Sequence, residues 1–228
     1  MHPANTDDPS LIVERMASLL AHDLCNSLSA IKINLQLLAR GADRSVQDAE
    51  RCHIGLSQIA EIEALIADLQ TFSRPSRLHT AQFSVVHLLN AACQRIDGMA
   101  KAAGVVLLVG TLDGLPAIRG DQGKLELALV HLLRNAVEAS AAGQSVRLDA
   151  HSLAGEGLVI AIEDSGCGMD AETLASARSP FFSTRPKGRG LGLSIAERVA
   201  AAHQGRLALD SAPGKGCCAR LYLSLSAV

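Results

Sequence analysis

The chain has 228 residues, of which 48% are hydrophobic and 19% charged, and its formal net charge is -2. This composition is that of a globular protein with material for one large domain or two modest ones, and it excludes a disordered or collagen-like chain. The near-neutral charge balance offers no basic surface, so we expect no nucleic-acid partner. No apolar run approaches the ~18 residues that a membrane span needs, so we expect no membrane insertion.

The cysteines and the N-terminus indicate a cytoplasmic protein. The starting segment MHPANTDDPS is polar and lacks the apolar region of a signal peptide. Free thiols in a reducing compartment are favoured over a disulfide framework, because no C-x-x-C spacing occurs among the six cysteines. These are Cys25, Cys52, Cys93, Cys167, Cys217 and Cys218.

The first part of the chain has the apolar periodicity of two helices. Apolar residues step by three and four through residues 10–40, and the same spacing recurs through 59–72 after a break at 41–44. Pro75 ends the second run, because the residue before a proline disfavours helix. We assign residues 1–78 to an α-helical hairpin. Since a hairpin cannot bury both apolar stripes alone, we expect a homodimer with a four-helix bundle.

Strands and helices mix in the remainder, residues 79–228. This order predicts an α/β sandwich in which helices cover one side of a single sheet. The expected strand-bearing segments are 83–89, 104–110, 145–151, 157–166, 205–211 and 217–226, and the expected helices are 88–104, 123–142 and 192–203, with a Gly- and Ser-rich loop region before the last helix.

His22 lies at the centre of the polar face of the first predicted helix. At 100° per residue the apolar positions from 24 to 38 fall about 160–240° away from it, whereas Asn26 lies within about 40°. A core position is thereby excluded, and no second His or Cys four residues away favours a metal site. An exposed imidazole beside the Asp23 carboxylate fits a nucleophile, although a solvated structural histidine has the same pattern.

Three segments of the second part carry chemistry. Asn135 is set among apolar residues of a predicted helix, and Asp164 ends a predicted strand in EDSGCGMD. In PFFSTRPKGRGLGLSIAERV, three glycines precede a helix, where backbone N–H groups and the helix dipole favour phosphate. A Rossmann site is disfavoured, because a long polar loop rather than a strand precedes the glycines. Each segment alone is common, but their order and spacing together are specific.

This ordered set resembles the sensor histidine kinases of two-component systems over nearly the whole chain. HDLCNSL resembles their phosphoacceptor box, LVHLLRNAVEA the N box, EDSGCGM the first glycine box, PFFST the F box and GRGLGLSIA the second glycine box. The segment DLQTFSRPS and the short lid are similar to the nitrogen-regulation type. The resemblance implies a dimerisation and phosphoacceptor hairpin followed by a catalytic ATP-binding domain of the GHKL, or Bergerat, type.

The resemblance also implies the activity. It implies a cytoplasmic ATP-dependent protein-histidine kinase that autophosphorylates His22 from Mg-ATP, passes the phosphoryl group to an aspartate of a response regulator and also dephosphorylates that partner. Asp23 would act as general base and orienting partner, and Asn26 would position the water for dephosphorylation.

In the second part the resemblance implies a site for ATP and Mg²⁺. Asn135 would coordinate Mg²⁺, and Asp164 would accept a hydrogen bond from the adenine amino group. Phe181 and Phe182 would anchor the lid over the phosphates. The remaining implied nucleotide-binding residues are His131, Gly166, Gly168, Thr184, Gly188, Gly190, Leu191 and Gly192.

Three positions depart from the family pattern. Ser27 stands where a proline usually follows Asn26, His131 replaces the first asparagine of the N box, and Glu138 stands where many relatives have a basic residue that meets phosphate. We expect these departures to affect the rate more than the reaction.

Other functions remain open at this point. The chief alternative is a histidine phosphotransfer scaffold with a degenerate ATP-binding domain, which the intact glycine boxes oppose and His131 favours. An ATPase or a serine kinase on the same fold is opposed by the hairpin with HDLCN, and a nonenzymatic interaction module has the least support. Since about ten residues precede the first helix, we expect the input to come either from a partner, such as a separate sensor protein, or from the helical bundle itself.

Overall fold

The structure is a computed structural model, and the chain divides into two compact units, Met1–Arg74 and Pro75–Val228, which are described separately. The described residues are 30–34, 47–48, 50–51, 53–59, 62, 78–112, 114–153, 157–185 and 188–224.

All described residues of the first unit are helical. Residues 30–34 belong to the first predicted helix, and the described residues between 47 and 62 belong to the second, as the apolar spacing predicts. His22, Asp23, Asn26 and Ser27 lie outside the described residues, so the hairpin's predicted active face stays a prediction.

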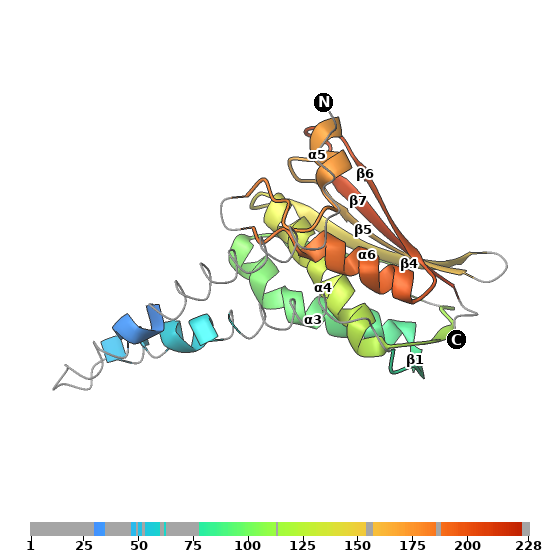
Figure 1. Cartoon of the computed structure of the whole chain (residues 1–228), viewed down its shortest axis with the longest axis horizontal. Coiled ribbons are helices and arrows are strands. Elements are labelled where there is room, and N and C mark those ends of the chain that lie inside the picture. The colour runs from blue at the N-terminus through green and yellow to red at the C-terminus, as the bar shows by residue number, and fades with distance from the viewer. Residues whose placement is uncertain are drawn as a thin grey trace, which may run out of the picture. The chain divides into compact units, whose positions relative to one another are not determined.

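The second unit is a mixed α/β domain in which helices and strands alternate along the chain (Figure 1). In chain order its elements are β1 (Ala81–Ser84), α3 (Val85–Ala103), β2 (Val106–Val109), β3 (Ala117–Gly120), α4 (Gln122–Ala139), β4 (Ser145–Leu153), β5 (Gly157–Asp164), α5 (Ala171–Ser176), α6 (Gly192–Ala202), β6 (Arg206–Ser211) and β7 (Cys217–Ser224).

Four of these elements are helices, namely α3, α4, α6 and the short α5, and the other seven are strands.

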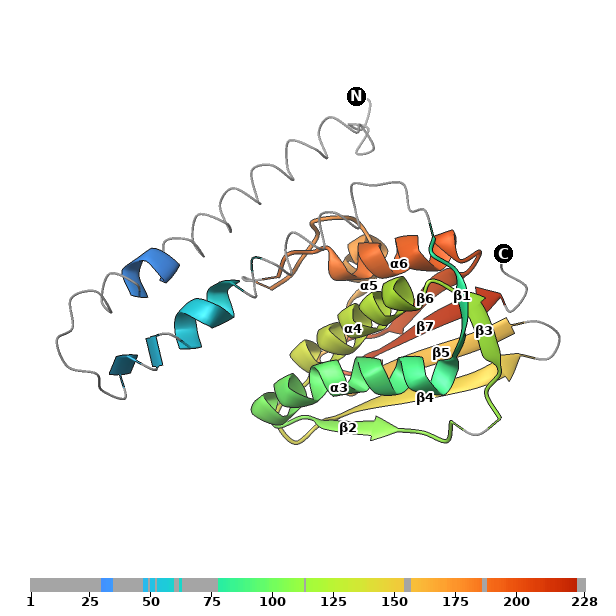
Figure 2. The same ribbon diagram turned by 90° about the horizontal axis from the view of Figure 1, so that it is seen from below.

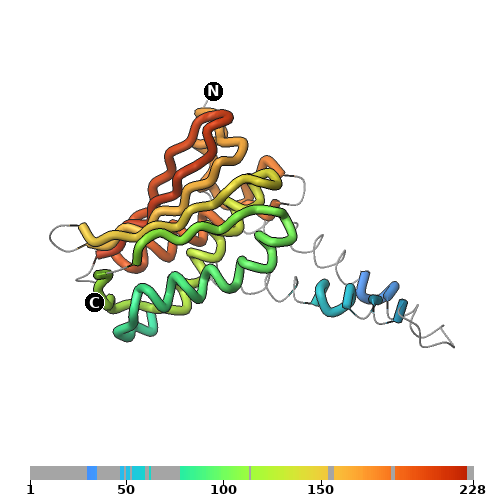
Figure 3. Tube along the Cα trace, turned by 180° about the vertical axis from the view of Figure 1, so that it is seen from behind, coloured from blue at the N-terminus to red at the C-terminus, as the bar shows by residue number. Residues whose placement is uncertain are grey.

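Five strands form one sheet in the order β2-β4-β5-β7-β6, in which β2 and β4 are parallel and the other neighbours antiparallel. β1 and β3 form a separate antiparallel pair. Viewed from behind, the strands lie in front of the helices (Figure 3). In the register of β5 with β7, Asp164 lies opposite Cys217, so the end of β5 meets the start of β7.

The helices α3, α4 and α6 cover one face of this sheet, with α4 between the other two (Figure 2). Alternate residues of β5 point into the layer between helices and sheet, and Leu158, Ile160 and Ile162 are at most 2% exposed. α4 contributes Leu125, Leu129 and other side chains at helical spacing to the same core. The predicted α/β sandwich with one helix-covered face is therefore confirmed.

Two short elements of the second unit were not predicted. β3 has four residues and pairs with β1, and α5 has six residues and begins after Asp170, whose carboxylate accepts the Thr173 N–H at 2.7 Å. Neither is long enough to produce an apolar period. α3 also begins at Val85, three residues earlier than expected, because Ser84 ends β1 in an extended conformation.

None of the helices that the structure describes combines the length and the apolarity needed to cross a membrane.

A buried polar network joins the start of α4 to the end of α6. Asp121, 8% exposed, accepts the N–H groups of Lys124 (3.1 Å) and His79 (3.0 Å) with its carboxylate. Its own N–H donates to Nε2 of His203 at 2.9 Å, and Nδ1 of that ring donates to the Val199 carbonyl at 2.8 Å. The carboxylate thus caps α4 and accepts from two part-buried backbone donors.

We predict that Asp121→Ala lowers the free energy of unfolding by about 1–2 kcal/mol, because the α4 cap is lost. Urea unfolding followed by circular dichroism measures the change. Asp97→Ala, which removes an exposed i,i+4 partner of Lys101, is the control and should cost less than about 0.5 kcal/mol. Equal effects of the two substitutions would contradict the capping role.

Candidate functional site

Asp164 is the last residue of β5 and is only 6% exposed. Its Oδ1 accepts hydrogen bonds from the N–H groups of Gly166 at 2.9 Å and Cys217 at 3.3 Å. Burial raises the pKa of the carboxyl above its ordinary value, while these two donors and the charge of Arg185 lower it. With Oδ1 held by backbone donors, Oδ2 is the oxygen that can accept from a ligand.

The thiol beside this carboxylate stays protonated. Burial, followed by the charges of Asp164 and Cys218, raises the pKa of Cys217 to about 12. Cys217 therefore places its N–H donor beside the carboxylate of Asp164 without adding a second negative charge.

In the predicted first glycine box, EDSGCGM, the backbone passes very close to two other segments of the chain. A Cβ on Gly166 would overlap the Ala139 carbonyl at the end of α4, and a Cβ on Gly168 would overlap the Ala212 carbonyl. Gly168 also has a φ of 65°, which L side chains rarely adopt. The N–H of Cys167 donates to the same Ala139 carbonyl at 3.3 Å, so the loop is tied directly to α4.

Four polar residues form one stripe along α4, which we call the α4 stripe: His131, Arg134, Asn135 and Glu138. Their spacing of three and four residues places them on one helix face. His131 is 2% exposed, and Nη2 of Arg134 lies 2.6 Å from its Nδ1. Because a guanidinium only donates, Nδ1 accepts and is not available as a metal ligand while this bond exists.

The start of α6 faces the α4 stripe. A Cβ built on Gly192 would lie 3.3 Å from Nδ2 of Asn135 and 3.4 Å from Nδ1 of His131. Leu191, 4% exposed, precedes the helix and its carbonyl accepts the Ser194 hydroxyl at 2.9 Å. The first-turn N–H groups of α6, which have no intrahelical acceptor, therefore lie close to Asn135.

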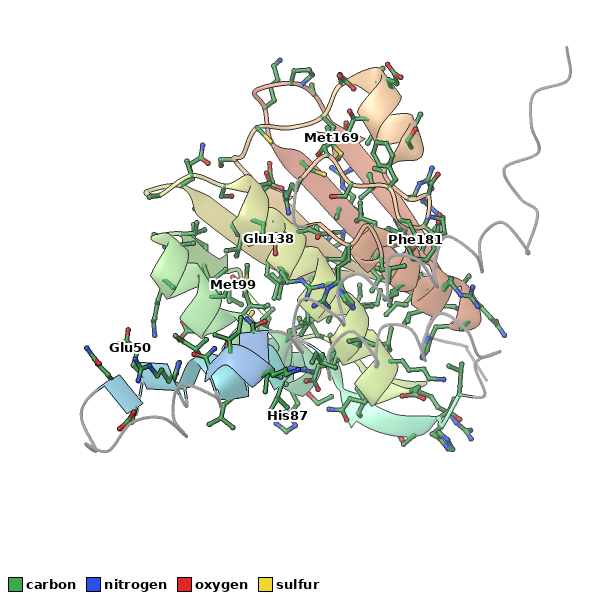
Figure 4. The ribbon with its side chains drawn as sticks, turned by 60° about the vertical axis from the view of Figure 1, so that its left-hand side comes forward. Glu50, His87, Met99, Glu138, Met169 and Phe181 are labelled. Carbon is green, nitrogen blue, oxygen red and sulfur yellow. The ribbon has the colours of Figure 1, made fainter. Side chains whose placement is uncertain are left out.

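The loop before α6 is closed on itself by backbone contacts. The N–H of Phe181 donates to the Gly190 carbonyl at 2.8 Å, and Gly190 has a φ of 66°. A Cβ on Gly190 would overlap the backbone of Phe181 and Phe182. Figure 4 labels Phe181 on this loop and Glu138 on α4. The predicted Thr184 lies exposed on the same loop.

Arg185 is a site residue that the sequence analysis missed. Its Nη1 forms an ion pair with Glu138, and its Nη2 donates to the Asn135 carbonyl at 3.1 Å. The sequence offered two signals for this ion pair, the acidic residue Glu138 in the N box and an arginine in the loop before α6. They stand 47 positions apart, and no local pattern pairs them.

Asn135 fits a Mg²⁺ that is bound together with phosphates. Among the described residues, no group of three or more His, Cys, Asp or Glu side chains is arranged to hold a metal ion. Mg²⁺ prefers oxygen ligands and commonly takes one or two from the protein, with water and phosphate oxygens completing its shell. The half-buried amide of Asn135, on α4 and close to the start of α6, offers one such oxygen.

We predict that Gly190→Ala opens the loop locally, because the new Cβ would collide with the backbone of Phe181 and Phe182. Hydrogen exchange at the Phe181 N–H should become faster by on the order of tenfold, a local loss of about 1.4 kcal/mol. Gly214→Ala is the matched control: its φ is 72°, but nothing lies within 4 Å of the added Cβ. Unchanged exchange at Phe181 in Gly190→Ala would contradict the prediction.

Most of the second unit matches a known protein family. Residues 120–227 match the family of histidine kinase-, DNA gyrase B-, and HSP90-like ATPases. Over 223 residues the chain is 33% identical to the signal transduction histidine-protein kinase AtoS of Escherichia coli strain K12. The match includes 93% of this chain and 36% of AtoS, so the chain spans about a third of that relative's length.

Solved structures share the fold. Full-length ShkA in complex with AMPPNP matches 94% of this chain and 47% of ShkA, with a TM-score of 0.71 and 21% identity. Histidine kinase ThkA in complex with the response regulator protein TrrA matches 94% of this chain and 62% of ThkA, with a TM-score of 0.70 and 17% identity. Residues 120–227, which contain Asp164, the glycine loops and the α4 stripe, belong to the histidine kinase-, DNA gyrase B-, and HSP90-like ATPases, and the chain is similar to the catalytic region of sensor histidine kinases.

Proposed function

We propose that the second unit binds ATP, with the adenine at Asp164. The observation that carries this proposal is a buried carboxylate whose Oδ1 is held by Gly166 and Cys217, which leaves Oδ2 for the adenine amino group. A carboxylate acceptor favours adenine over guanine, which presents a carbonyl oxygen at the corresponding position. The AMPPNP complex of ShkA, which has the same fold, supports an adenine nucleotide as ligand.

In this proposal the phosphates lie between the α4 stripe and the start of α6. Asn135 supplies an oxygen ligand for Mg²⁺, and the bound cation neutralises phosphate charge. The N–H groups after Gly188, Gly190 and Leu191 favour anions at the helix start. Thr184 and the two phenylalanines belong to the loop that flanks this space.

The reaction that we propose is autophosphorylation of His22. An imidazole nitrogen attacks the γ-phosphorus, the bond to the β-phosphate oxygen breaks, and ADP leaves. Asp23 accepts the ring proton and orients the imidazole, which as general base catalysis contributes roughly 10²–10⁴ in rate. Positioning and charge neutralisation supply most of the remainder in phosphoryl transfer.

We further propose an aspartate of a response regulator as the next acceptor, and Asn26 as the residue that positions water for its dephosphorylation. The complex of ThkA with a response regulator protein supports this class of partner. A homodimer formed through the hairpin is supported by exposed apolar side chains of the first unit: Ile54 (43%), Leu56 (65%) and Ile59 (42%).

A phosphotransfer scaffold is the second candidate function. The observation that favours it is His131, which stands at the first asparagine of the N box and engages Arg134 through Nδ1. In a scaffold of this kind His22 would relay phosphate between regulators, and ATP would not bind.

We predict that γ-labelled ATP with Mg²⁺ gives the protein an acid-labile, base-stable label, because phosphohistidine has that stability. The label should be absent from His22→Ala, which lacks the acceptor, and from Asn135→Ala, which lacks the metal ligand. Gel autoradiography after acid and base treatment measures it.

His53→Ala is the matched control for this experiment, because His53 is an exposed histidine of the same helical unit. It should keep the label. Label on His22→Ala would contradict the assigned acceptor, and an unlabelled wild type that binds no ATP would favour the scaffold.

We predict that adenosine binding weakens as the pH falls through the raised pKa of Asp164, which lies above the ordinary value of about 3.9. Protonation removes the charged acceptor for the adenine amino group, so affinity is full above this pKa and lost below it. Calorimetric titration with adenosine avoids the titration of phosphates.

Two variants sharpen the pH experiment. Asp164→Asn should bind adenosine weakly with no pH dependence in this range. Glu163→Gln should shift the midpoint downward, because the Glu163 charge raises the pKa of Asp164. A pH profile that Asp164→Asn leaves unchanged would contradict the assignment of this carboxylate.

A further inference from the structure

Arg185 bridges the loop before α6 and the α4 stripe. Its two terminal nitrogens have separate partners: Nη1 bonds the Glu138 carboxylate, and Nη2 bonds the Asn135 carbonyl at 3.1 Å. Its charge also lowers the pKa of Asp164. The guanidinium therefore lies near both ends of the proposed nucleotide site, the carboxylate for adenine and the residue for Mg²⁺.

The backbone of Arg185 is held independently of its side chain. Its N–H donates to the Ser183 hydroxyl at 3.1 Å, and its carbonyl accepts the Gly188 N–H at 3.0 Å. A Cβ on Gly188 would overlap the Ser183 hydroxyl, so this turn is compact. The guanidinium can accordingly change partners by rotation of its own side chain, with the turn in place.

Glu138 presents to Arg185 the same chemistry as a nucleotide phosphate, namely an anionic oxygen that accepts charged hydrogen bonds. The pair is half exposed, with 37% of the Arg185 and 36% of the Glu138 side chain accessible. Exposed pairs of this kind are weak, so a polyphosphate that brings several charges to the same site competes effectively.

We propose that Glu138 is the resting partner of Arg185, and that Arg185 exchanges this carboxylate for the phosphates of the bound nucleotide. The proposal deepens the ATP-binding function proposed above and rests on it. Arg185 is then a phosphate-binding residue of the loop, and Glu138 sets the affinity for ATP by holding that residue in the absence of nucleotide. Glu138 thus competes with the nucleotide phosphates for the Arg185 guanidinium.

The exchange is tested by the affinities of Mg-ATP and adenosine, measured calorimetrically for the wild type, Glu138→Gln, Arg185→Gln and the double variant. Glu138→Gln should bind ATP about two- to fivefold more tightly, because the competing exposed ion pair is removed. Arg185→Gln should bind ATP more weakly. At a pH well above the pKa of Asp164, adenosine, which has no phosphate, should bind all four proteins equally.

The double variant distinguishes the exchange of partners by Arg185 from a direct repulsion between the Glu138 carboxylate and the phosphates. If Arg185 changes partners, the gain from Glu138→Gln should disappear in the Arg185→Gln background, as coupled residues show in a double-mutant cycle. An equal gain in both backgrounds, or weaker or unchanged ATP binding in Glu138→Gln, would overturn the proposal.

A second ion pair of the same type provides the control. Arg178 and Glu197 form an exposed pair at 3.1 Å, and Arg178→Gln and Glu197→Gln should leave ATP affinity unchanged. If the wild type binds ATP and only the Glu138 and Arg185 results fail, the exchange is wrong and the proposed function stands. If the wild type binds no ATP, the proposed function fails and the exchange fails with it.

Discussion

The Asp164 carboxylate is the group on which the rest of the site depends, because burying a charge costs free energy unless hydrogen bonds compensate. Its two backbone donors come from Gly166, two residues along the chain, and from Cys217, on a strand 53 positions away. The second donor is present because β5 and β7 pair in a register that sets Asp164 opposite Cys217. A change in that register would remove a donor and move the carboxylate.

Close backbone approach is the second requirement of this arrangement. Gly216 precedes Cys217, has a φ of 72°, and would direct any Cβ into the Asp164 carbonyl. Gly166 meets the end of α4 in the same way. These contacts link the sheet to α4, whose stripe carries Asn135 one turn before that end. The helix α4 therefore sets the distance between the two ends of the proposed site, since the adenine end contacts its last residue and the phosphate end includes Asn135.

Helical periodicity and motif order predict much of this molecule. The apolar spacing of α4 and α6 is long enough to indicate helices, and the glycines beside Asp164 and before α6 indicate a nucleotide site. β3 and α5 are too short to produce such a signal. The tie between Arg185 and Glu138 depends on tertiary folding, which no local pattern contains. The roles of His22, Asp23 and Asn26 stay predictions, since these residues lie outside the described part of the chain.

The most direct test of the site is the mapping of nucleotide-induced changes in backbone amide NMR shifts with Mg²⁺ and AMPPNP. The account predicts that the largest changes occur at Gly166, Cys217 and Gly192, which flank the adenine and phosphate ends. Changes concentrated instead at the cavity of about 450 Å³ between α6 and β6, which Arg178 and Leu209 help to line, would contradict it. So would the absence of any change at saturating nucleotide.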